Sequence, residues 1–241
     1  MPGMHTKPSR AISNIRADRH VGLRLTAAVA VLATLGAACG DDDQGLSAAA
    51  CDTYAELQAG LFGDPAQLQP LAEAFAKEAP SELDESVDVL IAALTSDDPD
   101  ASETPEYAAA QTEIANAVFA DCKADTRADV KGIDYAFDGM PATIDAGRLS
   151  LRFTNASKAD EPHELIIVKG VNGENAEQLK AMPLEELFGA VQPIALAFTN
   201  TPGGVAATLV DLDPGEYLVI CTLPVGGFEA AQDGPGDPHA N

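Results

Sequence analysis

The hydrophobic pattern of the chain changes its period near residue 130, and this change limits the folds that the chain can adopt. Before it, apolar residues recur at spacings of three and four, as in "CDTYAELQAGLF" and "SELDESVDVLIAAL", which is typical of amphipathic helices. After it, apolar and polar residues alternate in short runs that end at Gly, Asp or Asn, which is typical of strands. The pattern therefore predicts an α+β protein of two domains: a small α-helical bundle over residues 47–126, then an all-β sandwich over residues 130–241.

Five strands and one helical excursion are expected in the second domain. The excursion is "NAEQLKAMPLEELFGAV", which interrupts the β-prone segments with a helical spacing of Leu residues. The strands are expected over residues 132–137, 147–155, 163–170, 206–212 and 216–222.

The first 38 residues have the pattern of a secretory signal peptide. Five Lys/Arg precede "LTAAVAVLATLGAAC", an apolar run that is too short for a membrane span and ends in small residues. The ending "LGAAC" resembles a bacterial lipobox, which implies that Cys39 is lipidated and becomes the first mature residue, followed by a tether over residues 39–46. The alternative is an ordinary signal peptide with a coincidental cysteine. With the lipid, the protein is exported and held at the outer face of the cytoplasmic membrane or in the periplasm.

The acidic composition excludes some partners. The whole chain has a formal net charge of −24, and residues 1–38 contribute +4 of it (five Lys/Arg against Asp18), so the remainder carries −28. A surface this acidic repels nucleic acid and anionic lipid. We therefore expect no nucleic-acid partner, and contact with a membrane through a covalent lipid rather than through basic side chains.

The positions of the four cysteines divide them into three roles. Cys51 and Cys122 bracket the helical segment, and a disulfide between them would persist in an exported protein and stabilise a bundle that buries little core. The alternative is two free thiols. With Cys39 lipidated, Cys221 is the odd cysteine, which in an exported protein suggests a ligand, a reactive thiol or an intermolecular bond.

Three segments of the second domain resemble those of cupredoxins. "LRFTNASKADEPHELIIV" is similar to the strand, loop and Pro-His that supply the first copper ligand in that family, "DPGEYLVICTLP" to the strand that ends in the ligand cysteine, and "GDPHAN" to the second ligand histidine. The resemblance implies a Greek-key sandwich and one mononuclear copper site with His163, Cys221 and His239 as ligands. It also implies a redox or copper-exchange protein as a partner.

The residue types suit that metal. Two imidazoles and a thiolate accommodate both oxidation states of copper, and His163 and His239 are the only histidines outside residues 1–38. Two features depart from the family pattern. Seventeen residues separate Cys221 from His239, and the chain ends without the axial methionine and final strand that follow in the family. We therefore expect a C-terminally truncated sandwich in which the last strand is missing and one sheet edge is unpaired.

No motif indicates an enzyme: the glycines of "TPGGVAAT" lead into a strand rather than opening a helix, and no base is indicated near Cys221. Three hypotheses follow. The first is copper binding for electron transfer or copper handling. The second is a metal-free cupredoxin-like module for binding or scaffolding, with the bundle as its interaction surface. The third is copper storage or delivery without redox turnover.

Overall fold

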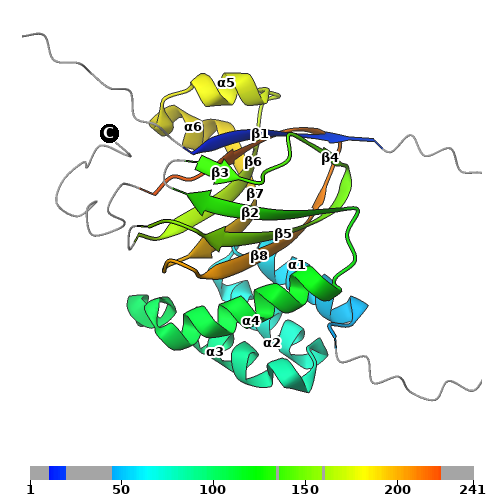
Figure 1. Ribbon diagram of the computed structural model, residues 1–241, viewed down its shortest axis with the longest axis vertical. Coiled ribbons are helices and arrows are strands. Elements are labelled where there is room, and N and C mark those ends of the chain that lie inside the picture. The colour runs from blue at the N-terminus through cyan, green and yellow to red at the C-terminus, as the bar shows by residue number, and fades with distance from the viewer. Residues whose placement is uncertain (1–10, 20–44, 134–135, 159–160, 224–241) are drawn as a thin grey trace, which may run out of the picture.

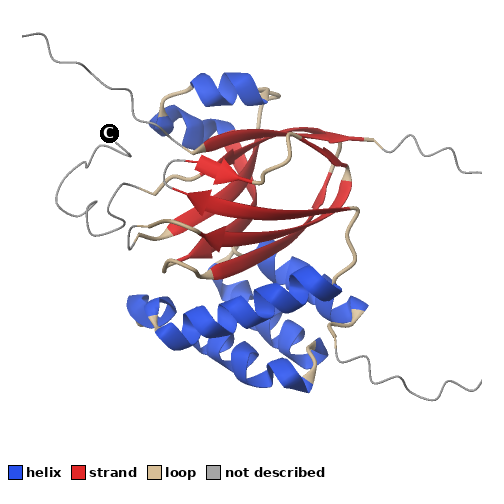
Figure 2. Ribbon diagram, in the orientation of Figure 1, coloured by secondary structure: helices blue, strands red, loops and turns tan. Residues whose placement is uncertain are grey.

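The computed structural model describes residues 11–19, 45–133, 136–158 and 161–223. Within them the chain forms a helical bundle stacked against a sandwich of two β-sheets (Figures 1 and 2). The α+β arrangement expected from the change of period is confirmed, with the helices first along the chain and most of the strands after them. In the part of the chain that the structure describes, no helix has both the length and the apolar character needed to span a membrane.

The bundle consists of four helices joined by short 3-10 turns. Ser47 and Thr104 cap two of them, because each side chain accepts a hydrogen bond from a backbone N–H three residues later. The side chains that face inward, among them Leu57, Phe75 and Val118, form one buried cluster. The helices are α1 (Ala48–Gly60), α2 (Leu68–Glu78), α3 (Asp84–Leu94) and α4 (Pro105–Asp121), with 3-10 turns at Pro65–Gln67, Ser81–Leu83 and Pro99–Glu103.

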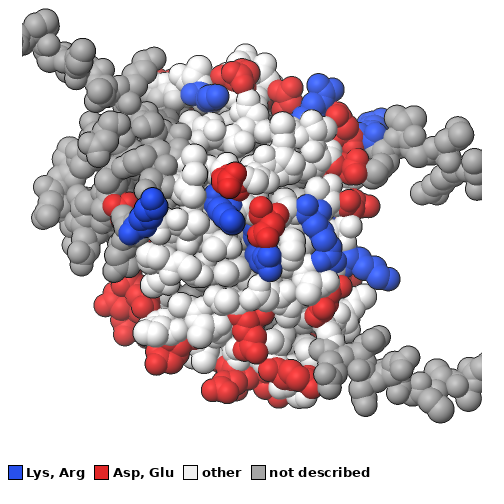
Figure 3. Space-filling model, in the orientation of Figure 1, with Lys and Arg blue, Asp and Glu red and all other residues white. Residues whose placement is uncertain are grey.

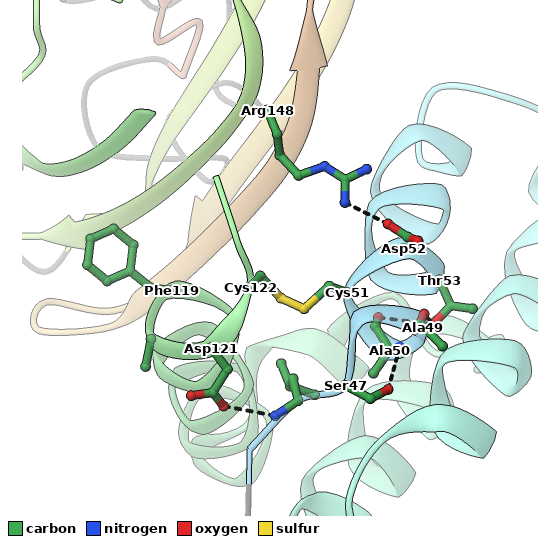
Figure 4. The surroundings of a disulfide bond; sticks show 12 residues. Ser47, Ala49, Ala50, Cys51, Asp52, Thr53, Phe119, Asp121, Cys122 and Arg148 are labelled. Atoms are coloured by element: carbon green, nitrogen blue, oxygen red, sulfur yellow. Dashed lines mark hydrogen bonds and ion pairs between the residues drawn. A yellow bond between two sulfur atoms is a disulfide. The ribbon is translucent and has the colours of Figure 1, made fainter. Parts of the chain in front are cut away.

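A disulfide joins the first and last helices of the bundle (Figure 4). Cys51 near the start of α1 is bonded to Cys122 directly after α4, with a Cα–Cα distance of 5.6 Å. Asp121 accepts a hydrogen bond from the Leu46 N–H at 2.9 Å, so the chain before α1 is held at the same place. The predicted pairing of these two cysteines is confirmed.

Two sheets form the sandwich. One has the strand order β4-β1-β9-β6-β7 and the other β3-β2-β5-β8. The strands are β1 (Ile12–Asp18), β2 (Thr126–Ile133), β3 (Ala136–Asp138), β4 (Thr143–Asp145), β5 (Gly147–Asn155), β6 (His163–Gly170), β7 (Val191–Thr199), β8 (Val205–Leu212) and β9 (Gly215–Ile220).

Alternation of side chains assigns each sheet an inner and an outer face. Leu149, Leu151 and Phe153 of β5 pack inward against strand residues of the opposite sheet, such as Leu165 and Ile167. The outer face of the β5–β8 sheet packs against the bundle through β8 side chains. The other outer face is covered by α5 (Ala176–Ala181) and α6 (Leu184–Ala190), which match the predicted helical excursion.

Strand β1 comes from the N-terminal segment and was not predicted. It pairs antiparallel with β9, from Ile12 opposite Ile220 to Ala17 opposite Gly215, and parallel with β4. Ile15 and Ala17 are buried in the core between the sheets. One expectation is therefore corrected: the sandwich is not confined to residues 130–241. A missing last strand was also expected to leave one sheet edge unpaired, and among the described residues β9 is paired on both sides, with β1 and with β6.

The strand expected over residues 132–137 is also corrected. In the structure β2 begins earlier, at Thr126, and forms a hairpin with β3 in which Ile133 lies opposite Ala136. Because two residues connect β2 and β3, apolar residues remain at every second position from Ile133 to Phe137. The sequence pattern of a hairpin is therefore the same here as that of one continuous strand. Strand β7 was missed because Pro193 and two alanines, Ala195 and Ala197, weaken its strand pattern.

Candidate metal centre

The segment that carries His163 is held at the end of β5 by one asparagine. Asn155 is fully buried, its Nδ2 donates to the carbonyl of Glu161 at 2.8 Å, and its Oδ1 accepts from the Ser157 N–H at 3.0 Å. Its backbone also pairs with Gly203 and Gly204 before β8. These bonds fix both ends of the connection between β5 and β6, so the position of His163 is set by a buried side chain.

His163 is the first residue of β6 and its side chain is 6% exposed. Gly132 of β2 lies beside it: a Cβ at that position would come within 3.5 Å of the His163 Cβ and within 2.6 Å of the Phe153 ring. The absence of a side chain at Gly132 therefore leaves room for the Phe153 ring beneath the histidine.

Cys221 follows β9 directly and is 3% exposed. Its N–H donates to the carbonyl of Ala11, just before β1, at 3.3 Å. The thiol belongs to a small apolar cluster with Ala11 and Leu223, against which Phe137 and Phe198 pack. Apolar side chains from four separate segments thus enclose the sulfur.

The pairing of β6 with β9 places His163 and Cys221 on the same face of the sheet. Ile166 lies opposite Ile220, and continuing this antiparallel register puts Leu165 opposite Cys221. Residues two apart on a strand share a face, so His163, Leu165 and Cys221 all face the inside of the sandwich, where Leu165 is buried. His163 and Cys221 are then diagonal neighbours, about 7–8 Å apart at the backbone.

Two further contacts link the strand ends that carry these residues. Glu164 Oε1 accepts hydrogen bonds from both the N–H and the hydroxyl of Thr222, at 2.7 and 2.6 Å. Burial raises the pKa of the Cys221 thiol to about 11, while the nearby backbone N–H groups of Glu164 and Leu223 act in the opposite direction. The thiol thus lies against the residue that follows His163, and the metal-free fold holds it protonated at neutral pH.

His239, the third predicted ligand, and Cys39, the predicted lipidation site, lie outside the described residues. Across the described ranges, no group of three or more His, Cys, Asp and Glu is arranged to hold a metal ion. The structure therefore brings together two of the three predicted ligand positions.

The donor set of this pair suits a soft or borderline cation. A thiolate and an imidazole on one inner face, surrounded by Phe and Leu side chains, are the ligand types that copper and zinc take in proteins. A cation held by Cys221 and His163 would displace the thiol proton, and its positive charge would offset the cost of burying the thiolate.

Sequence reasoning missed three residues of this centre: Ala11, Gly132 and Phe198. Ala11 lies in a segment that has the basic, non-strand composition of a signal peptide, and Phe198 lies on the strand that was not predicted. Gly132 did carry a signal, since a glycine within a strand pattern often marks a close approach of another side chain.

The charged groups are distributed unequally over the molecule. Residues 47–122 contain 16 Asp and Glu and a single basic residue, Lys77. On the face shown in Figure 3, acidic side chains gather over the bundle at the bottom, while basic side chains cross the sandwich in the middle of the view. Two basic residues of strand β5 form ion pairs: Arg148 with Asp52 and Asp211, and Arg152 with Asp129.

Comparison with known proteins yields one structural likeness. No family model and no curated protein matches the chain. A solved structure that resembles it is sodium-dithionite-reduced auracyanin from the photosynthetic bacterium Roseiflexus castenholzii, at 26% sequence identity over 43% of this chain and 89% of that chain, with a TM-score of 0.33.

Proposed function

We propose that the sandwich binds one copper ion through His163 and Cys221, with His239 as the third ligand, for electron transfer or copper handling. The observation that carries this proposal is the placement of His163 and Cys221 on the same inner face, at the ends of adjacent strands. Core packing alone does not require a cysteine and a histidine to lie together at the strand ends where Asn155 and Glu164 fix the backbone.

The residues around the pair support a site that holds its shape. Asn155 fixes the approach to β6, and Glu164 ties Thr222 beside the cysteine. Copper bound by a thiolate and imidazoles exchanges one electron. A site whose protein atoms are held by buried hydrogen bonds changes little between the two oxidation states, and this favours electron transfer over storage.

We further propose that the protein is exported and anchored by a lipid on Cys39, in contact with a redox or copper-exchange protein. This part rests on the sequence pattern of residues 1–38. Because β1 lies within those residues, cleavage before Cys39 removes a central strand from the sheet. The mass of the exported protein tests this directly: a mass that corresponds to residues 39–241 plus a lipid supports the anchor, and retention of Ile12–Asp18 refutes it.

Metal analysis of the full chain tests the copper site. The unaltered chain, after incubation with Cu(I) or Cu(II) and removal of free metal, is expected to retain one copper per molecule. Cys221→Ser and His163→Ala should each lower the retained copper more than tenfold, and His239→Ala should weaken binding less. His20→Ala is the matched control. Equal copper retention by all these proteins would remove the proposal.

A metal-free binding or scaffold module is the second candidate. The observation that favours it is the strongly acidic bundle, which offers a surface for a basic partner without any metal. Absence of copper retention by the full chain, together with capture of a basic partner by the bundle, would support this candidate over the first.

A further inference from the structure

A small cavity lies where the bundle meets the edge of the sandwich. It has a volume of about 150 Å³ and is lined by residues of α1, α3 and α4 on one side and of β7 and β8 on the other. Neither His163 nor Cys221 lines it. Most of its wall is apolar, from residues such as Leu57, Leu61, Leu94, Ile114 and Leu196. An engineered cavity of about this volume, with an apolar lining, takes up benzene.

The polar side chains of the wall come from Tyr54 and Gln58 of α1 and from Tyr107 and Gln111 of α4. Gln111 Nε2 donates to the carbonyl of Phe198 at 3.0 Å. The Tyr54 hydroxyl donates to the carbonyl of Ala207 in β8 at 2.9 Å and accepts from Gln58 Nε2 at 3.2 Å. Because the hydroxyl proton is already used, only the amide nitrogen of Gln58 can bond to it, and this fixes the orientation of the amide.

That orientation directs the other amide atom away from Tyr54. Gln58 Oε1 is buried and has no hydrogen-bond partner among the described residues. A buried acceptor without a donor is unfavourable, and it is expected to be paired in the functional state of a protein. A ligand in the cavity that carries an O–H or N–H group supplies the missing donor.

Aromatic side chains narrow the class of ligand. Tyr54, Tyr107 and Phe198 are among the lining residues, and aromatic rings pack favourably against a flat aromatic molecule. The volume limits the ligand to about one ring. Among the described lining residues, Gln58 Oε1 is the one side-chain oxygen that is buried without a hydrogen-bond partner, so one donor group on the ligand suffices. We propose that this cavity binds a small phenol-like molecule, with its ring among the apolar side chains and its hydroxyl donating to Gln58 Oε1.

Phenol and toluene, which differ by one donor, test the proposal on the full chain. Titration is followed by the NMR shifts of Ile and Leu methyl groups. Phenol is expected to shift the methyls of Leu57, Leu94 and Ile114 and to bind more tightly than toluene. Gln58→Leu and Gln58→Met should each lower the affinity for phenol roughly 3- to 10-fold, the effect of one lost hydrogen bond, and leave toluene unchanged. Gln69→Leu, on the exposed face of α2, is the matched control and should change neither affinity.

Filling the cavity provides a second, independent test. Leu94→Trp places a large ring in the cavity from the last residue of α3 and should abolish binding of both molecules, while the methyl spectrum of the sandwich remains that of the unaltered protein. Three results would overturn the proposal: no methyl shift with phenol up to its solubility, equal affinity of phenol and toluene, or phenol binding that persists in Leu94→Trp.

Discussion

The bundle and the sandwich are closed in opposite ways. The bundle is one continuous segment of the chain, and a disulfide between Cys51 and Cys122 joins its first and last helices. The sandwich takes its strands from both ends of the chain, and it is closed by β1, which lies about 200 residues before its partner β9. The bundle therefore depends on a covalent bond near its ends. The sandwich depends on hydrogen bonding and packing with a strand that lies far away in the sequence.

This difference predicts that damage to β1 and damage to the disulfide act on different halves of the molecule. The two halves share part of one core, because Ala207 and Leu209 of β8 pack with the helices. Separate damage to the bundle and to the sandwich is therefore best detected by methods that report on single helices and strands, such as hydrogen exchange, together with the unfolding of the whole protein.

The largest effect is expected from removal of β1. A chain that starts at residue 39 leaves the edges of β4 and β9 unpaired and exposes the core around Ile15. Its free energy of unfolding should fall by more than the roughly 2–5 kcal/mol expected for Ile15→Ala alone. Hydrogen exchange should accelerate in β9 more than in α4, whereas Arg16→Ala, on the exposed face of β1, should change it little. Equal acceleration of hydrogen exchange in β9 and in α4 would contradict the prediction that loss of β1 acts mainly on the sandwich.

Loss of the disulfide is expected to be nearly as severe, but in the other half. Cys51→Ala with Cys122→Ala removes a cross-link between residues 71 apart. This lowers the free energy of unfolding by about 4 kcal/mol, as estimated from the loop entropy of the unfolded chain. Urea unfolding measures the loss. As a control, the unlipidated full chain, unfolded without reduction, should show two reactive thiols out of its four cysteines. Four reactive thiols would show that the cross-link does not form.

A smaller effect is expected at the contact between the halves. Tyr54→Phe removes the buried hydrogen bond from the hydroxyl to the carbonyl of Ala207, which should cost about 1–2 kcal/mol of unfolding free energy. Hydrogen exchange should accelerate in α1 and β8 together. An effect confined to α1 would show that the bundle and the sandwich are not coupled through this bond.

The smallest effect is expected from the ion pairs of Arg148 with Asp52 and Asp211, at 2.6 and 3.0 Å. Arg148 lowers the pKa of Asp211. The pair therefore contributes stability above the ordinary carboxyl pKa of about 4, and this contribution is lost as the pH falls through the lowered value. Because both aspartates are largely exposed, we expect Asp211→Asn to cost less than about 1 kcal/mol at neutral pH.

Urea unfolding of both proteins at several pH values measures this last effect. The difference between the unaltered chain and Asp211→Asn should shrink as the pH falls below about 4. A difference that grows toward low pH would reverse the sign and refute the assignment to Arg148.

The bundle could be predicted from sequence because its information is local. Its helices show their own periodicity, and Cys51 and Cys122 mark the ends of the segment that they join. Strands β5, β6, β8 and β9 were predicted for the same reason. Strand β5 alternates apolar and polar residues, and the other three are β-prone runs with turn signals between them. Cys221 and His163 were predicted as ligands from the resemblance of their segments to those of cupredoxins, and the structure places both at strand ends.

Strand β1 could not be predicted because nothing local defines it. Only Ile15 and Ala17 of its residues are deeply buried. Its one basic residue, Arg16, stands between Arg10 and Arg19 in a stretch that matches the start of a signal peptide equally well. Strand β1 is stabilised by pairing with β4 and β9. This pairing depends on the position of the unpaired backbone groups of those two strands, which are distant in the sequence. The part of the metal centre that β1 adjoins, at Ala11, was missed for the same reason.

The visible absorption spectrum after addition of Cu(II) reports on copper binding by Cys221, because a buried thiolate bonded to Cu(II) absorbs intensely and an adventitious surface ion does not. The full chain is expected to develop such a band to saturation at one Cu(II) per molecule, and to lose it on reduction. Cys221→Ser should show no band, and His163→Ala a weak or shifted one, while the control His20→Ala keeps it unchanged. A full chain that stays colourless at saturating Cu(II), or a band that survives in Cys221→Ser, would contradict the assignment of Cys221 and His163 as copper ligands.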